Sequence, residues 1–473
     1  MAECARDWAK TELAALDLGD QRLRRRAVDV LARIAQAPGG RITQVFKTNA
    51  EHQGAYDLLG NRSVSRGALG EALADACWQR SIELARGAPL TVIVPFDGTA
   101  VGVPDHKHTK SFGAVGTYSN GGRGLQVMTA LALAPDGTPI GVPAQRYWSR
   151  PVERPRRMRT HWRKTAAKET QHTLDLLNDV QRGAALSPCL RLMFVGDRGY
   201  DGGPILTALA TSGHDFVIRV CRNRRTDAEI GERTPHYLRE RIAKSRVLGC
   251  YKLHVRGGHK RKERVAIMEV RATRVTLVLH DAYAKKEAFL TVNVVQTRER
   301  RTTPKGEKPL DWTLFTNVDV ADLGQAIAVV DTYALRWRIE EFHRAWKTGA
   351  CNVEGSRLHS PERLEKWATL LAAVAARIER MKQLSRESPE QPASIELTPG
   401  EIAAVLWFKR KYKKRNEVVS DNPTIAEAVK WIAEMGGYTG YGGPPGTITI
   451  TRGLDRIAVL ADYLGVKKPP RKK

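Results

Sequence analysis

The sequence contains few cysteines and no long apolar run, and each shortage excludes a class of protein. Its six cysteines among 473 residues show no framework spacing and no Cys-x-x-Cys pair, which argues against a disulfide scaffold and a zinc ribbon. The longest near-apolar stretch, 367–376, is about half as long as a membrane-spanning helix. The first residues carry charges without an apolar segment, so no signal peptide is expected. We therefore expect a cytoplasmic protein with no membrane partner.

Acidic residues are scarce relative to basic ones. The chain has 77 lysines and arginines against 51 aspartates and glutamates, a formal net charge of +26. Much of the excess is clustered, at 146–168, 260–264, 409–415 and 467–473. A single run of charge is usually a solvated surface, but several clusters of the same sign favour contact with phosphates. We expect a nucleic acid partner, although the sequence does not distinguish which cluster contacts it.

Common nucleotide-binding and hydrolase motifs are missing as well. The P-loop, Gly-x-Ser-x-Gly and His-Glu-x-x-His patterns do not occur. His106 and His108 form a His-x-His pair, but no second set of ligands accompanies it. Loop histidines are therefore the preferred interpretation of this pair.

Apolar residues at helical spacing characterise the first part of the chain, 1–75. Leu23, Val28, Leu31 and Ile34 recur as expected for one face of a helix, and arginines crowd the start of that helix. We predict an N-terminal helical domain whose basic helices suit a DNA groove. A domain that only packs against the rest of the chain is the alternative.

The pattern changes to alternating strands and helices in residues 76–384. Buried strands are predicted at 90–97, 125–133, 138–148, 189–197 and 215–220, and helices at 166–181 and 205–213. This order of elements fits the α/β class and, within it, a ribonuclease H-like catalytic core.

Later segments predict an insertion and further helices. β-Branched runs separated by basic or Pro/Gly turns predict a β-rich insertion at about 240–318. One long helix is predicted from about 325 to 347 and another at 361–384. The remainder, 385–473, is predicted to be a mostly helical C-terminal domain with a basic tail.

Two aspartates, Asp97 and Asp197, each end a predicted buried strand. A single carboxylate at such a place more often serves a turn or a cap. Two of them on strands that the ribonuclease H topology would place side by side are more specific, because close carboxylates favour a divalent cation between them.

A third carboxylate is expected from the helix predicted at 325–347. At about 100° per residue, Tyr333, Arg336, Glu340 and Lys347 fall on one polar stripe, opposite an apolar face. Glu341 lies off both faces and is expected to be solvated or paired with a neighbouring base. The alternative interpretation of the stripe is a surface of ion pairs four residues apart.

These four stripe residues carry a resemblance to a known family. Tyr333-x₂-Arg336-x₃-Glu340-x₆-Lys347 matches the Y-R-E-K signature of the insertion-sequence-four family of bacterial transposases. Five other segments also resemble that family: 7–23, 51–65, 96–99, 194–201 and 309–317. The resemblance extends over nearly the whole chain and is weakest after about 385.

The resemblance implies a catalytic triad of Asp97, Asp197 and Glu340. It implies that these carboxylates hold two Mg²⁺ (or Mn²⁺) ions per active site, which activate the attacking oxygen and stabilise the leaving oxygen. Gly199, two residues after the second aspartate, departs from the best-known member, which has an acidic residue there. That departure leaves the triad intact.

The resemblance also implies contacts with double-stranded DNA. Tyr333, Arg336 and Lys347 would hold phosphates, Arg219 would contact the hairpin region, and Trp312 would stack on a flipped base. A core tryptophan is the alternative for Trp312. Residues 150–168 are strongly basic where the best-known member is acidic, which puts the DNA contacts and the end sequence in doubt.

The function implied is that of a cut-and-paste transposase in the bacterial cytoplasm, associated with the nucleoid. It would bind the terminal inverted repeats of its element, excise it through a hairpin and join the 3′ ends to target DNA, acting as a homodimer. Apolar faces of the C-terminal helices could serve that dimer or simply fold a small domain: Ile402, Val405, Leu406, Ile457, Leu460 and Leu464. The alternatives are a ribonuclease H-fold nuclease or resolvase, and a non-catalytic DNA-binding regulator.

Overall fold

The computed structural model describes residues 3–39, 41–105, 110–116, 121–152, 158–227, 236–258, 262–281, 286–413, 415 and 417–466. The His106/His108 pair, the basic tail and the side chains of 153–168 in the first basic cluster lie outside the described residues. None of the described helices combines the length and the hydropathy that crossing a bilayer requires.

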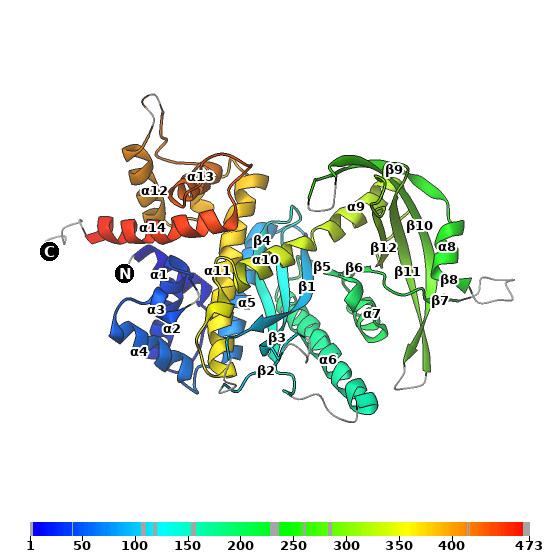
Figure 1. The fold of residues 1–473 in the computed structure, drawn as a ribbon, viewed down its shortest axis with the longest axis horizontal. Coiled ribbons are helices and arrows are strands. Elements are labelled where there is room, and N and C mark those ends of the chain that lie inside the picture. Colours follow the sequence, from blue (N-terminus) through cyan, green and yellow to red (C-terminus); the bar gives the residue numbers. More distant parts are fainter. Residues whose placement is uncertain are drawn as a thin grey trace.

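The N-terminal region is helical, as predicted. Its helices are α1 (Glu3–Glu12), α2 (Gln21–Gln36), α3 (Ile42–Val45), α4 (Asn49–Gly60) and α5 (Arg66–Ala85). The Asp20 side chain caps α2 by accepting the N–H of Arg22, and Thr48 and Glu51 form a capping box on α4. The first four helices gather at one end of the molecule, and α5 runs against the sheet (Figure 1).

A twelve-stranded mixed sheet forms the centre of the described structure. Its first strands are β1 (Leu90–Gly102), β2 (Gly113–Ala114), β3 (Arg123–Leu133), β4 (Pro139–Trp148), β5 (Leu190–Gly196) and β6 (Asp215–Arg219). Strand β1 pairs in parallel with β5, and β5 with β6, whereas β3 pairs antiparallel with β1. Helices α6 (Met158–Ala184) and α7 (Gly203–Ala210) connect the parallel strands. The predicted α/β class is confirmed.

The strands predicted within 240–318 are present and extend the same sheet. The elements are β7 (Arg225–Thr226), β8 (His236–Tyr237), α8 (Leu238–Lys244), β9 (Val247–Val255), β10 (Arg264–Asp281), β11 (Lys286–Glu299) and β12 (Asp311–Thr316). Strand β12 pairs directly with β6, so the β-rich segment continues the central sheet towards the end opposite the N-terminal helices (Figure 1). Its β-structure begins at Arg225, earlier than predicted.

The single helix predicted at 325–347 is wrong, because two helices occupy this region. These are α9 (Leu323–Ala334) and α10 (Trp337–Lys347). Where α9 ends and α10 begins, the N–H groups of Arg336, Arg338 and Ile339 each donate to the carbonyl oxygen of the residue three positions earlier. Such bonds tighten the helix and turn the residues that follow relative to a regular α-helix.

Helix α11 (Pro361–Glu387) lies between the sheet and the two helical ends of the chain (Figure 1). The C-terminal helices are α12 (Pro399–Lys411), α13 (Ile425–Met435) and α14 (Thr447–Val466). Helices α13 and α14 pack against α11, and all three pack against one another. Val405, Leu406 and Ile457 are buried in these contacts, so they fold this region rather than face a partner. The boundaries predicted at 75 and 384 fall inside α5 and α11, and the division into three domains stays a prediction.

Candidate active site

Parallel pairing of β1 with β5 places the first two predicted carboxylates at neighbouring positions. The register pairs Pro95 with Val195, and Asp97 and Asp197 each follow two residues later. Asp197 comes directly after β5, as predicted. The prediction that Asp97 ends its strand is wrong, because β1 continues to Gly102 through its antiparallel pairing with β3.

The Asp97 carboxylate is fixed through one oxygen. Its Oδ1 accepts the N–H of Gly98 at 2.8 Å and the hydroxyl of Tyr200 at 3.1 Å. Burial, followed by the charge of Asp197, raises the pKa of Asp97 to about 6, although these hydrogen bonds and Arg336 oppose the shift. Burial and the neighbouring Asp197 thus disfavour the ionised form of Asp97, and a nearby cation would favour it.

Asp197 is the N-cap residue of a short 3₁₀ turn, η2 (Arg198–Tyr200). Its Oδ1 accepts the N–H of Gly199 at 2.7 Å. A β-carbon at Gly199 would lie 2.9 Å from this same oxygen, so glycine leaves the carboxylate room at the position where the sequence departs from its family resemblance. The turn therefore holds the second carboxylate through a backbone donor.

The third predicted carboxylate, Glu340, is linked to Asp97 through an arginine. Arg336 Nη2 donates to Glu340 Oε1 at 2.6 Å, and Arg336 Nη1 lies 3.9 Å from Asp97 Oδ2. Across the described part of the chain, no three Asp, Glu, His or Cys side chains are grouped as metal ligands. The structure thus brings Asp97 beside Asp197 and links Glu340 to Asp97 through the Arg336 guanidinium.

The neighbouring Glu341 pairs with different residues from Glu340. It pairs with Arg338 at 3.1 Å and with Lys382 of α11 at 3.4 Å. The prediction was that Glu341 is either solvated or paired with a neighbouring base, and the pairing with Arg338 confirms the second possibility.

Lys347 ties α10 to strand β1. Its Nζ donates to Thr99 Oγ1 at 3.2 Å and lies 3.4 Å from Glu354 Oε1. The same Glu354 oxygen accepts the N–H of Gly102 at 3.0 Å. The lysine therefore lies beside the strand that carries Asp97, two residues beyond that carboxylate.

The prediction that Tyr333 lies on a polar face is wrong, because its side chain is buried and only 3% exposed. Its ring packs edge-on against Trp312 with centroids 5.2 Å apart, and the Arg336 guanidinium lies 6.0 Å from the Tyr333 centroid. Arg219, on β6, donates to the carbonyl of Asp311, the residue before Trp312, at 3.3 Å. Four of the predicted DNA contacts thus lie in one group: Arg219, Trp312, Tyr333 and Arg336, with Trp312 only partly buried. Lys347 lies apart from this group, at Thr99 and Glu354.

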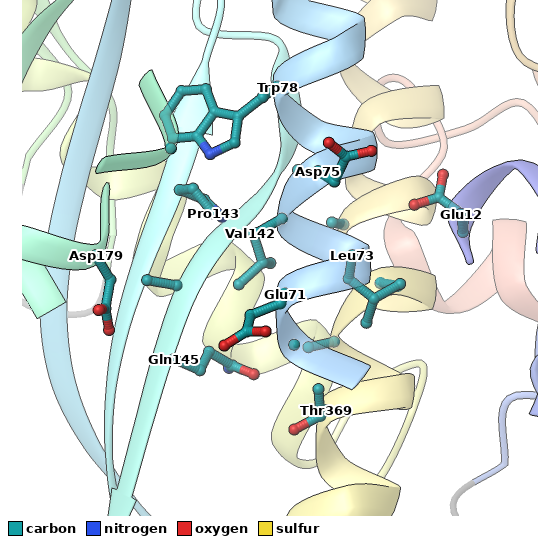
Figure 2. Close-up of a pocket in the computed structure, with 18 of the residues that line it drawn as sticks. Glu12, Glu71, Leu73, Asp75, Trp78, Val142, Pro143, Gln145, Asp179 and Thr369 are labelled. Carbon is teal, nitrogen blue, oxygen red and sulfur yellow. The ribbon is translucent and has the colours of Figure 1, made fainter. Parts of the chain in front are cut away.

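A cavity of about 490 Å³ lies elsewhere, between α5, β4, α6 and α11 (Figure 2). Two of its carboxylates are paired: Asp179 with Arg146 and Arg182, and Glu12 with Arg80. None of the predicted triad residues lines this space, so it is separate from the candidate active site.

The sequence reasoning missed Tyr200 and Glu354. Tyr200 lies within the segment 194–201 used for the resemblance, and its spacing of three residues from Asp197 was the available signal. Glu354 carried no signal, because its partners Gly102 and Lys347 come from distant segments.

Comparison with known families gives two matches. Residues 5–64 match the family described as "Transposase DNA-binding", and this stretch contains α2, α3 and α4. Residues 89–376 match the family described as "Transposase DDE domain", which covers more than half of the chain. The second match includes Asp97, Asp197 and Glu340.

Proposed function

The chain belongs to the transposase DDE domain family, and we propose that it is a cut-and-paste transposase of the insertion-sequence-four type. The two matches identify a DNA-binding transposase, and the DDE domain implies dependence on a divalent metal. In our proposal the protein binds the terminal inverted repeats of its own element, excises it through a hairpin and joins the 3′ ends to target DNA. We also propose a ribonuclease H-like core and action in the bacterial cytoplasm at the nucleoid.

The observation that carries the proposal is the pairing of β1 with β5 around Asp97 and Asp197. Parallel strands seldom bring two carboxylates to the same level of a sheet without a cation or a base to compensate them. Arg336 compensates only part of this charge, since it is bound to Glu340 and lies 3.9 Å from Asp97.

The donor chemistry fits Mg²⁺ or Mn²⁺, which prefer carboxylate oxygens. Asp97 and Asp197 would hold the ions, and Glu340 would join them once its bond to Arg336 is released. Two bound ions would supply activation of the attacking oxygen and stabilisation of the leaving oxygen. A DNA phosphate is a suitable competitor for Arg336, because a guanidinium binds phosphate in the same forked geometry as carboxylate.

The residues around this edge have roles in positioning DNA in the proposal. Arg336 and Lys347 would hold phosphates, and Arg219 would contact the strand that folds into the hairpin. Trp312, partly buried beside Tyr333, would stack on the base that a tight hairpin extrudes. Tyr333 would reach a phosphate only after it moves from its present contact with Trp312.

Two DNA ends must be held together for excision, and we propose a homodimer for this step. Ile448 and Val459 of α14 are 55% and 72% exposed and lie about three helical turns apart on one side of the helix. These two exposed residues, rather than the buried Val405 and Ile457, are apolar positions that a partner copy could cover.

The test uses the full chain with linear DNA that carries the sequences flanking its own gene. With Mg²⁺ or Mn²⁺ we expect a nick, then a strand of doubled length on a denaturing gel from the hairpin, then 3′ ends joined to a plasmid. Cleavage without joining would favour the nuclease or resolvase. Specific binding without cleavage at any metal concentration would favour the non-catalytic regulator.

The dimer is tested separately with Val459→Glu. This variant should still bind a single end, and it should lose the complex of two ends in a native gel. A two-end complex that forms as readily as with the unmodified chain would contradict a dimer through α14.

A further inference from the structure

The Tyr200 hydroxyl lies between the backbone of β1 and the Asp97 carboxylate. It accepts the N–H of Gly98 at 2.7 Å and donates to Asp97 Oδ1 at 3.1 Å. The Met128 sulfur is 3.5 Å away, but an ionised carboxylate is a much better acceptor than a thioether. The single hydroxyl proton of Tyr200 is therefore directed to Asp97.

The 3₁₀ turn explains how one short segment reaches both carboxylates. The N–H of Tyr200 donates to the carbonyl of Asp197 at 3.1 Å. Side chains three residues apart lie on the same side of a 3₁₀ turn, so Tyr200 points towards β1 alongside the Asp197 carboxylate. Asp197, directly after β5, thus supplies one carboxylate. Tyr200, three residues later, holds the carboxylate of Asp97 in place.

We propose that Tyr200 is a positioning residue that fixes Asp97 Oδ1, so that Asp97 Oδ2 is presented to the divalent metal. The inference rests on the proposed function, because it concerns the same metal-binding edge. The other oxygen, Oδ2, lies 3.9 Å from Arg336 Nη1. A carboxylate anchored through one oxygen loses less rotational freedom when its other oxygen binds a metal.

Packing alone does not account for a tyrosine at this position. The ring packs against Phe96 with centroids 4.7 Å apart, and phenylalanine would fill that space equally well. The hydroxyl lies in a group that is only 9% exposed, where an unused polar atom would be costly. Because so little of Tyr200 is exposed, it acts through Asp97 and does not itself reach DNA.

The test compares Tyr200→Phe with Tyr251→Phe in the full chain. Tyr251 of β9 is also partly buried, and its hydroxyl bonds to Thr297 Oγ1 at 3.2 Å, away from the carboxylates. Free Mn²⁺ is measured by electron paramagnetic resonance during a titration, and Asp97→Asn identifies the binding that depends on this site. Thermal unfolding with and without Mn²⁺ gives a second measure of metal binding and checks that each variant folds.

Tyr200→Phe should weaken the Asp97-dependent binding of Mn²⁺ about tenfold, as expected for loss of a hydrogen bond to a charged group. The Mn²⁺ concentration for half-maximal DNA cleavage should rise by the same factor. The rate at saturating Mn²⁺ should stay within about threefold of the unmodified chain, because the carboxylates themselves remain. Tyr251→Phe should change neither Mn²⁺ measure.

A purely structural role would lower the unfolding temperature without changing the Mn²⁺ midpoint, and that result would overturn the inference. Equal Mn²⁺ binding by Tyr200→Phe and the unmodified chain would also overturn it, as would Mn²⁺ binding that does not depend on Asp97. The proposed function fails in a different way: if the unmodified chain binds Mn²⁺ through Asp97 yet cuts no DNA, the binding titration still decides the role of Tyr200.

Discussion

Two clusters of poorly solvated charge in this molecule differ in how completely they are neutralised. Between α11 and α12, Arg377 pairs with Glu396 at 3.2 Å and with Glu401 at 2.9 Å, and Arg380 also pairs with Glu396. That cluster has two arginines for two glutamates, all of them nearly buried. At the β1/β5 edge, Asp97 and Glu340 share the guanidinium of Arg336, and the charge of Asp197 lies close to Asp97.

The difference separates a structural charge cluster from a candidate catalytic one. A balanced buried cluster stabilises a particular packing but has no capacity for a further ion. An excess of one charge, held in place by hydrogen bonds, favours a ligand of the opposite charge. The triad edge should therefore be sensitive to substitution in catalysis, and the α11/α12 cluster should be sensitive in folding.

The largest expected effect is loss of catalysis at the triad edge. Asp97→Ala, Asp197→Ala and Glu340→Ala should each reduce metal-dependent DNA cleavage by about 1000-fold or more, because each removes a metal ligand. Binding to DNA ends, measured by gel shift, should remain. A variant that keeps full cleavage would remove that residue from the triad.

Glu341→Gln is the matched control on the same helix. Its pairing with Arg338 and Lys382 belongs to packing, so the rate per folded molecule should change by no more than about threefold. A loss of cleavage as large as that of Glu340→Ala would show that Glu341 is as important for catalysis as Glu340.

The next effect is on stability, in the balanced cluster. Arg377→Met leaves Glu396 and Glu401 without their shared partner and should lower the free energy of unfolding by about 3–5 kcal/mol. Urea unfolding followed by circular dichroism measures the change. The fraction that remains folded should cleave DNA at the rate of the unmodified chain. If the folded Arg377→Met protein cleaved DNA more slowly, the α11/α12 cluster would also affect catalysis, and the two clusters would not differ in role.

Sequence reasoning separated Glu340 from Glu341 correctly, because helical phase holds within α10. It placed Tyr333 wrongly, because the tight turn at 336–339 intervenes, and its bonds three residues apart cannot be inferred from apolar periodicity. The juxtaposition of Asp97 with Asp197 followed from the ribonuclease H topology that the order of strands and helices predicted, and the pairing of β1 with β5 agrees with it. The bridging position of Arg336 did not, because it depends on how α10 packs against β1.

Exposed arginines at the start of α2 provide a third kind of charge, which is in contact with solvent, although Arg22 pairs with Asp20 at 3.4 Å. Arg22, Arg25 and Arg26 are exposed within the segment that matches the DNA-binding family. Replacing all three with Ala should weaken DNA-end binding about 10- to 100-fold at about 0.15 M salt and reduce the salt dependence by about three ions.

Arg191→Ala is the control for this charge effect. Arg191 is exposed near the start of β5, at the end of the strand away from Asp197. It should change binding by no more than about threefold. If the triple variant and this control behave alike, α2 is not the main DNA-binding element.

The smallest expected effect concerns Asp455 of α14, which resembles Asp97 in its pKa but not in its neighbours. Burial raises the pKa of Asp455 to about 6, against the opposing charge of Lys47, and its Oδ1 has no hydrogen-bond partner in the described structure. The folded chain holds this proton more tightly than the unfolded chain, whose aspartate has its ordinary pKa of 3.8. Stability from Asp455 is therefore fully present below about pH 4 and is lost as pH rises to about 6.

Asp455→Asn should remove that loss and raise the unfolding temperature by about 2 °C or less at pH 7.5, with no gain at pH 4. Scanning calorimetry at the two pH values measures the difference. DNA cleavage should be unchanged, because the charge that acts on Asp455 among the described residues is that of Lys47, whereas Asp97 has Asp197 beside it and Asp97→Asn should abolish cleavage. If Asp455→Asn also stopped cleavage, a raised carboxylate pKa alone would indicate a functional residue in this chain. The neighbouring carboxylate of Asp197 would then not be what distinguishes Asp97 from Asp455.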